Sequence, residues 1–260
     1  MKSEMPEITV TAIPAFADNY IWLISTSGNQ CAVVDPGDAG PVAQVLERHG
    51  LKLEYILITH HHADHTGGVK QLVNSYGARV FGPHDRRIPG QDESFRESET
   101  VRLPLLELEF SVIEVPGHTA SHIAFFGHGC LFCGDTLFSV GCGRLFEGSP
   151  EQMQSSMDKL AALPEETRVF CAHEYTLSNC DFALAVEPEN ENLIRRASEV
   201  EASRATGRST VPSRLGEECA VNPFLRCRQP SVVAAAQKRD PHAAPGAATL
   251  AVIRSWKDSF

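Results

Sequence analysis

The densest group of residues that could do chemistry is the segment 59–65, which reads THHHADH. Four of the chain's 11 histidines lie in it, between an apolar stretch and a helix-like pattern. His60 and His62 are two residues apart, so an extended backbone directs both side chains to the same side. Asp64 and His65 follow beyond the bend and can reach a second point nearby. Neutral imidazole and carboxylate groups together suit zinc, iron or manganese, so this segment predicts a metal site.

A solvated histidine-rich loop, or a histidine pair at the start of a helix, is the alternative interpretation of this segment. Four histidines and an aspartate at this spacing argue against it. His61 lies between the two aligned histidines, so we expect its side chain to point away from the site and not to bind metal. One loop supplies too few ligands for two closed metal sites, and further ligands must come from elsewhere.

Three further candidates each end an apolar strand pattern: His118 in VPGHT, Asp135 in LFCGDT and His173 in VFCAHE. Taken singly, a histidine at a strand end is more often a hydrogen-bonded structural residue, and an aspartate is more often a helix N-cap. Because all three stand in the same kind of position and accompany the histidine loop, we interpret them as its missing partners.

The elements that must position these residues are strands and helices that alternate in the first part of the chain, and helices alone in the second. Strand patterns lie at 8–13, 20–26, 31–37, 55–60, 78–82, 106–115, 122–127, 130–135 and 168–173, and helix patterns at 39–50, 67–77 and 149–163, the last opened by Ser149 as N-cap and Pro150 in the first turn. After residue 173 we expect helices at 176–187, 191–207, 230–240 and 249–260. The sequence therefore predicts two domains, 1–173 and 174–260.

Composition narrows the classes of function. The chain has 260 residues and a net charge of −10, which disfavours binding to a phosphate backbone. It lacks the roughly 18-residue apolar run of a membrane span, and its first residues do not resemble an export signal, so we expect a cytoplasmic monomer with no nucleic-acid or membrane partner. Cys130 and Cys133 form a CxxC, but their apolar surroundings favour buried strand thiols over a redox pair.

The motifs carry a family resemblance. The runs THHHADHTGG, PGHT, GDTLF and CAHEY resemble the metallo-β-lactamase superfamily in its dinuclear hydrolase form. The segments ADNYIWLI, VVDPGDA, GDTLFSVGCGRLFEG, HEYTLSNCDFALAVEP, VPSRLGEECAVNPFLR and RSWKDSF are similar to the hydroxyacylglutathione hydrolase (glyoxalase II) family within it. The likeness spans essentially the whole chain. It implies an α/β fold, an αββα sandwich as catalytic domain over 1–173, and a C-terminal all-helical domain that binds glutathione over 174–260.

The resemblance also implies the ligands. One divalent ion would be held by His60, His62 and His118, the second by Asp64, His65 and His173, with Asp135 bridging the two. Asp64 and Asp135 would position a bridging hydroxide, which such a metal pair makes available near neutral pH. Zinc is the expected metal, with iron and manganese as alternatives.

Residues for the glutathione half are implied in the same way: Arg144, Phe146, Tyr175, Arg254 and Lys257. Animal members of the family have Lys and Tyr where this chain has Arg144 and Phe146. Arg144 keeps the charge, whereas Phe146 lacks a hydroxyl that could bind glutathione. Without the resemblance, Arg254 and Lys257 would be interpreted as favourable cations at the end of a C-terminal helix.

The implied activity is hydrolysis of S-(2-hydroxyacyl)glutathione, with S-D-lactoylglutathione giving D-lactate and glutathione after glyoxalase I in methylglyoxal detoxification. A thiolate leaving group, whose thiol has a pKa near 8.5, needs no strong general acid. Three alternatives stay open: another superfamily hydrolase such as a β-lactamase or lactonase, a mononuclear iron persulfide dioxygenase, and a metal-binding module without activity. Neither the cellular metal nor the range of acyl groups follows from the sequence.

Overall fold

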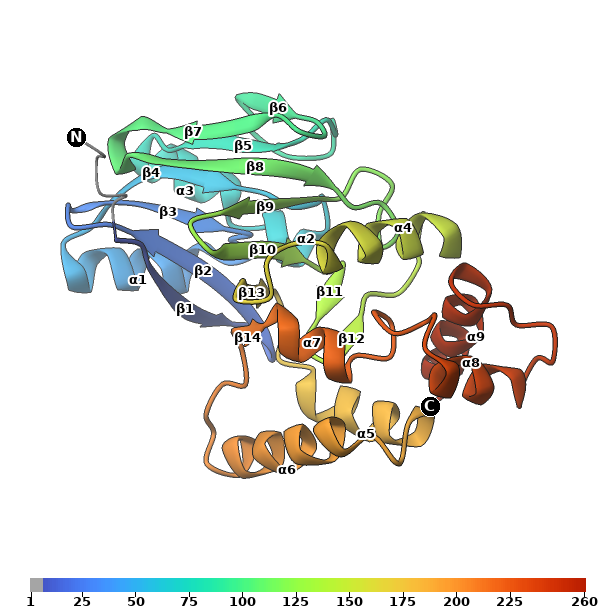
Figure 1. Cartoon of the computed structure of the whole chain (residues 1–260). Helices are drawn as coiled ribbons and strands as arrows, with labels where there is room; N and C mark the ends of the chain where they lie inside the picture. Colours follow the sequence, from blue (N-terminus) through green and yellow to red (C-terminus); the bar gives the residue numbers. More distant parts are fainter. Residues whose placement is uncertain (1–6) are drawn as a thin grey trace, which may run out of the picture. The chain divides into compact units, whose positions relative to one another are not determined.

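The computed structural model describes residues 7–260 (Figure 1). The first six residues, on which the expectation about an export signal partly depends, lie outside the described part. The chain forms two compact units, one made of the residues up to Glu114 together with Ile123–Gly134, the other of Val115–His122 together with Asp135–Phe260. Over the residues described, no helix combines the length and the apolar character needed to cross a bilayer.

A mixed sheet forms the first layer of the first unit. Its strands, in both spatial and chain order, are β1 (Thr9–Ala15), β2 (Asn19–Ser25), β3 (Gln30–Val34), β4 (Lys52–Leu57), β5 (Arg79–Pro83) and β6 (Glu93–Phe95). The first three pair antiparallel, and β3 to β6 pair parallel. Parallel neighbours need crossover connections, which helices α1 (Ala39–His49) and α3 (Val69–Tyr76) provide.

The two crossover helices share one apolar core with the sheet. Val42 and Leu46 of α1 and Leu72 of α3 are 2% exposed or less, and they belong to the same cluster as Leu23 and Ile56 of the strands. This packing fixes the point at which β4 ends, and the histidine loop leaves the sheet there.

Four antiparallel strands follow in the same unit: β7 (Thr100–Leu103), β8 (Leu108–Glu114), β9 (Ile123–Gly127) and β10 (Cys130–Gly134), with a 3-10 turn, η1 (Pro104–Leu106), between the first two. Strand β8 alternates buried and exposed residues, as expected for one covered face. Strand β10 is buried throughout, and Cys130 and Cys133 are free thiols at 0% exposure. The interpretation of the CxxC as buried strand thiols is confirmed.

The second unit carries most of the helices. It contains a short hairpin, β11 (Leu137–Phe138) and β12 (Gly141–Cys142), and a second strand pair, β13 (Arg168–Cys171) with β14 (Ser213–Arg214). Its helices are α4 (Pro150–Ala161), α5 (Thr176–Val186), α6 (Glu191–Ala205), α7 (Leu215–Val221), α8 (Pro230–Gln237) and α9 (Ala247–Asp258). Ser149 caps α4 and Pro150 opens its first turn, as the sequence predicts.

The structure confirms the expected mixture of sheets and helices and the largely helical second part, with two kinds of difference. The tail contains β14, so it is helical but not purely so. The short elements β6, β7, α7 and the single-turn helix α2 (Ala63–Thr66) were not expected. None of these runs exceeds seven residues, which is too short to show a clear period in the sequence. The domain boundary at residue 174 stays a prediction.

Candidate metal centre

The histidine loop leaves β4 at Leu57 and turns into α2. It lies close against the turn that follows β3: a Cβ at Gly37 would stand 1.8 Å from the Asp64 carbonyl oxygen, and the Gly68 amide donates to the Pro36 carbonyl at 2.9 Å. Only glycine at residue 37 allows the two backbones to approach this closely. The local sequences VVDPG and DHTGG therefore fold as a pair, and together they fix where the loop presents its ligands.

Asp35, in the turn after β3, holds the histidine loop against that turn. Its side chain accepts the Thr59 amide at 2.7 Å and the Thr59 hydroxyl at 2.6 Å, and it contacts Nδ1 of His65 at 3.0 Å. Asp35 is 4% exposed and has a positive φ of 52°, a conformation that non-glycine residues rarely adopt. A carboxylate at Nδ1 keeps the His65 proton on that nitrogen, so that Nε2 presents its lone pair to a metal.

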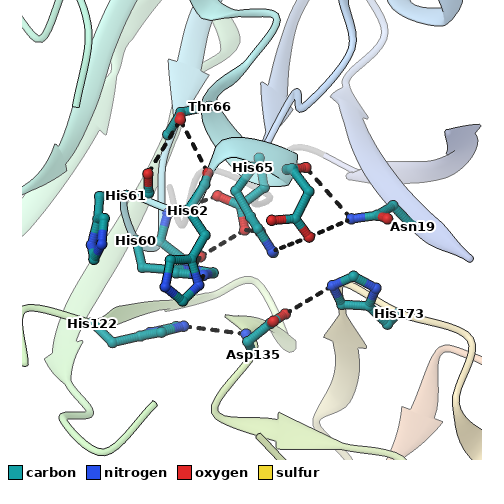
Figure 2. Close-up of polar contacts among 12 residues, drawn as sticks. Asn19, His60, His61, His62, His65, Thr66, His122, Asp135 and His173 are labelled. Carbon is teal, nitrogen blue, oxygen red and sulfur yellow. Dashed lines mark hydrogen bonds and ion pairs between the residues drawn. The ribbon is translucent and has the colours of Figure 1, made fainter. Parts of the chain in front are cut away.

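The four ligands expected from the loop come together in the structure (Figure 2). Nε2 of His60 lies 3.1 Å from Nδ1 of His62, and the His60 and His65 ring centroids are 4.1 Å apart. Nε2 of His65 lies 3.4 Å from Oδ2 of Asp64. The Asn19 amide at the start of β2 donates to that same carboxylate oxygen at 3.2 Å, so a neighbouring strand orients Asp64. Closely spaced nitrogen and carboxylate donors of this kind suit a divalent cation.

His61 contacts a residue that is not among the expected ligands. Its Nδ1 lies 3.4 Å from Oδ2 of Asp85, and its ring centroid is 4.8 Å from that of His62. That His61 points away from the site and binds no metal stays a prediction.

The three strand-end candidates of the second unit also come together. The Asp135 carboxylate lies 3.4 Å from Nε2 of His118 and 3.3 Å from Nε2 of His173 (Figure 2 shows the contact with His173). Nδ1 of His118 donates to the Arg144 carbonyl at 2.9 Å, which turns its Nε2 toward Asp135. One carboxylate therefore faces two imidazole nitrogens from different segments.

His122 has a structural role. It is fully buried, and its Nε2 accepts the Asp135 amide at 3.2 Å (Figure 2). This hydrogen bond requires a neutral ring with its proton on Nδ1. His122 thus fixes the backbone of the residue whose carboxylate faces His118 and His173.

Two of the expected glutathione contacts are aromatic and lie beside metal-ligand candidates. Tyr175 stacks on His173 with ring centroids 4.7 Å apart and planes 8° from parallel. Phe146 meets the His118 ring edge-on at 5.2 Å and is 62% exposed. An exposed aromatic ring at this position leaves apolar surface available to a ligand.

Two of the three expected cations, Arg144 and Arg254, contact Asp258. Its Oδ1 lies 3.5 Å from Nε of Arg144 and 3.1 Å from Nη2 of Arg254. Arg254 is 5% exposed and donates to the Cys142 carbonyl at 2.8 Å, so part of its hydrogen-bonding capacity serves the fold. Burial, helped by the neighbouring charge of Arg254, lowers the pKa of Lys257 to about 8.

Sequence reasoning overlooked Asp35 and Asn19 as functional residues. Both lie in segments that carry the family resemblance, and Asp35 ends an apolar strand pattern, the same signal that selected His118, Asp135 and His173. Asn19 gives no such signal, because its role depends on a residue 45 positions away.

Comparison with known proteins adds independent information. A model of the metallo-beta-lactamase superfamily matches residues 16–173, and a model of the hydroxyacylglutathione hydrolase C-terminus matches residues 174–260. A protein of Photobacterium profundum named hydroxyacylglutathione hydrolase is 54% identical over 255 residues, 97% of this chain and 100% of the relative. ETHE1 from Myxococcus xanthus has a similar fold, with a TM-score of 0.66, 22% identity and coverage of 96% of this chain and 99% of that one. TTHA1623 in a di-iron-bound form gives a TM-score of 0.58 at 26% identity, with 84% of this chain and 100% of that one covered.

Proposed function

This chain belongs to the hydroxyacylglutathione hydrolase family of the metallo-beta-lactamase superfamily, and on that premise we propose that it hydrolyses S-(2-hydroxyacyl)glutathione thioesters. The observation that carries the proposal is the match over 97% of the chain, helical part included, at 54% identity. The expected substrate is S-D-lactoylglutathione, which gives D-lactate and glutathione as the second step of methylglyoxal detoxification. The 22% likeness to ETHE1 shows a common fold only.

The donor set fits two divalent ions, since it offers five imidazoles and two carboxylates. We assign one ion to His60, His62 and His118, the other to Asp64, His65 and His173, and both to Asp135. The contacts of the Asp135 carboxylate with two histidine nitrogens support its assignment as the shared ligand. Zinc is the expected metal, and the di-iron form of TTHA1623 keeps iron as an alternative, with manganese. When bound, the ions would supply a hydroxide near neutral pH and polarise the thioester carbonyl.

The residues of the chain hold and orient the reactants. Asp64 and Asp135 orient the attacking water, while Asp35 and the Arg144 carbonyl fix the tautomers of His65 and His118. As the water gives up one proton to solvent, its oxygen bonds to the acyl carbon, the carbon–sulfur bond breaks, and glutathione leaves as a thiolate. Because its thiol has a pKa near 8.5, the thiolate leaves without a strong general acid.

Selectivity for glutathione is assigned to the cations and the two aromatic rings. Arg144 is well exposed, with 64% of its side chain accessible, and its long contact with Asp258 could be exchanged for a glutathione carboxylate. Lys257 and Arg254 add positive charge in a protein whose net charge is −10. Tyr175 and Phe146 would cover the peptide backbone of the ligand. Cations in a partly enclosed site bind carboxylates more strongly than they would in water.

We further propose a cytoplasmic monomer with a catalytic domain over 1–173 and a glutathione-binding domain over 174–260. All eight cysteines are free thiols, the form that the cytoplasm maintains. Size-exclusion chromatography with light scattering tests the monomer, which predicts a mass of 28.4 kDa.

A direct test follows thiol release from S-D-lactoylglutathione by purified, metal-loaded protein. We expect turnover that a chelator abolishes and added zinc restores, with two metal ions per chain by elemental analysis. Absence of turnover in metal-replete protein would contradict the proposal. One iron per chain with oxygen consumption would favour the dioxygenase instead.

A further inference from the structure

The segment GEECAVNPFLR resembles the family but takes no part in the site described so far. In the structure its first half forms α7, and two of its buried side chains reach the tip of the β11–β12 hairpin. Glu218 is 0% exposed, and its Oε2 accepts the Val140 amide at 2.7 Å. The Asn222 amide donates to the Phe138 carbonyl at 3.1 Å and to the Gly141 carbonyl at 3.0 Å.

The hairpin tip has a backbone that needs such support. Val140 has a φ of +58°, and a β-branched residue is a marked outlier in that region. Conformations of this kind persist only where the surroundings impose them. Here Glu218 holds the Val140 amide, Asn222 holds the carbonyls on either side, and Asn179 donates to the Ser139 carbonyl at 2.9 Å.

The base of the same hairpin leads directly to the reacting groups. Asp135 precedes β11 and Arg144 follows β12. A Cβ at Gly143 would stand 2.0 Å from the Asp135 carbonyl oxygen and 2.9 Å from Nδ1 of His118, so this return strand packs against both. The Arg144 carbonyl then fixes the His118 ring. A shift of the tip would therefore be passed to Asp135, His118 and Arg144.

Glu218 is a buried carboxyl that gathers several polar groups around the hairpin tip. Burial raises its pKa, and hydrogen bonds with the Val140 amide, Ser213 and Ser139 oppose that rise, as does the charge of Arg196. Val140 belongs to the same apolar cluster as Val221, which neighbours Asn222 in the chain. Burying a carboxyl costs desolvation energy, and two of its partners, Val140 and Ser139, lie at the hairpin tip, which points to a role in holding the hairpin.

We infer that Glu218, assisted by Asn222, is a positioning residue for the hydrolysis: it keeps Val140 in the left-handed conformation and thereby sets Asp135, His118 and Arg144. The inference rests on the proposed function, because the hairpin matters for turnover only if its base carries the site.

The test compares Glu218→Ala, Glu218→Gln and the double variant Glu218→Ala/Val140→Gly, with Glu217→Ala as the matched control on the same helix. Glutamine retains an oxygen that accepts the Val140 amide, and glycine adopts a positive φ without support. With zinc-loaded protein and S-D-lactoylglutathione we expect Glu218→Ala to lose at least tenfold in kcat/KM, Glu218→Gln to stay within threefold of wild type, and the double variant to recover at least threefold over Glu218→Ala. Glu217→Ala should stay within twofold.

Hydrogen–deuterium exchange over 137–142 gives a readout that does not depend on activity. Exchange should be faster in Glu218→Ala and close to the wild-type rate in Glu218→Gln. Wild-type kcat/KM and exchange in Glu218→Ala, or no recovery in the double variant, would overturn the inference. If Glu218→Ala does not fold, Asn222→Ser takes its place. We expect this variant to lose at least fivefold in kcat/KM, and a wild-type kcat/KM would again overturn the inference. A wild-type protein without turnover refutes the proposed function instead, and the exchange rates still decide the role of Glu218.

Discussion

Asp35 decides how the histidine loop presents His65, and this can be tested with an almost isosteric change. In Asp35→Asn the amide group can still accept the Thr59 amide, but its NH₂ would face Nδ1 of His65 and favour the tautomer with the proton on Nε2. We expect a 10- to 100-fold loss in metal affinity, the range typical of partners that orient metal-binding histidines. Titration against a competing chelator measures it.

Asp38→Asn is the control for this variant. Asp38 caps α1 by accepting the Gly40 amide at 2.8 Å, and asparagine caps helices equally well. This variant should therefore bind metal as the wild type does. Wild-type affinity in Asp35→Asn would show that the carboxylate does not set the tautomer of His65.

Lys257 predicts a pH dependence of substrate binding. Because burial lowers its pKa to about 8, Lys257 carries its charge below pH 8 and loses it as the pH rises through that value. If this charge binds a glutathione carboxylate, KM for S-D-lactoylglutathione should rise between pH 7 and 9. Lys257→Met should raise KM at pH 7 several-fold and remove this rise. Steady-state kinetics at both pH values measures it.

Lys238, the exposed residue that caps the C-terminal end of α8, provides the matched substitution, since Lys238→Met also removes one positive charge. Its pH profile should follow the wild type. If KM still rises with pH in Lys257→Met as it does in the wild type, the pH dependence of KM comes from titration of the substrate or of another residue.

Residues whose role is local could be predicted from the sequence, and residues whose role depends on distant partners could not. Residue type and spacing within six positions were enough to identify His60, His62, Asp64 and His65. Glu218 acts on a residue 78 positions earlier in the chain, and Asn19 on one 45 positions later. Nothing near either residue in the sequence reveals such a contact, because the fold alone brings the partners together.

At the scale of elements, α4 shows how a local signal sets a boundary. The Ser149 hydroxyl accepts the Gln152 amide at 3.3 Å, and the Gln152 side chain accepts the Ser149 amide at 2.9 Å, which forms a capping box. We expect Ser149→Ala to lower the free energy of unfolding by about 1 kcal/mol and the Tm by about 2–4 °C. Thermal unfolding checks this, with the exposed mid-helix change Ser155→Ala as a control that should cost less. Equal losses in the two variants would rule out the cap as the cause.

The elements that the sequence predicted well are those whose own residues mark the beginning, the repeating apolar pattern and the end of the element. Helix α1 has the Asp38 cap, an apolar stripe and Gly50 at its end, and its bounds agree with the expected 39–50 to within one residue. Strand β14 has only two residues, and it exists because Ser213 pairs with Val169 of β13. Helix α7 has no side-chain cap. Tertiary pairing, rather than local preference, defines these short elements, so a local pattern does not reveal them.

At the scale of the whole molecule, net charge describes the surface and not the site. The value of −10 argues against nucleic acid as a partner, yet Arg144, Arg254 and Lys257 gather within one unit. An acidic protein with one local group of cations can attract a small anion such as glutathione while repelling polyanions elsewhere on its surface.

The C-terminal segment 174–260 completes the core of its unit, which makes it more than an appended binding module. Strand β14 pairs with β13, the Leu215 amide donates to the Thr167 carbonyl at 2.9 Å, and Arg254 holds the Cys142 carbonyl. A fragment 1–173 would leave these groups, and buried residues such as Phe170, without partners. We therefore expect it to bind a hydrophobic dye and to lose cooperative urea unfolding. A chain lacking only 259–260, where Phe260 is 64% exposed, should unfold like the full chain. Cooperative unfolding of a monomeric 1–173 fragment would contradict this expectation and show that the proposed catalytic domain folds on its own.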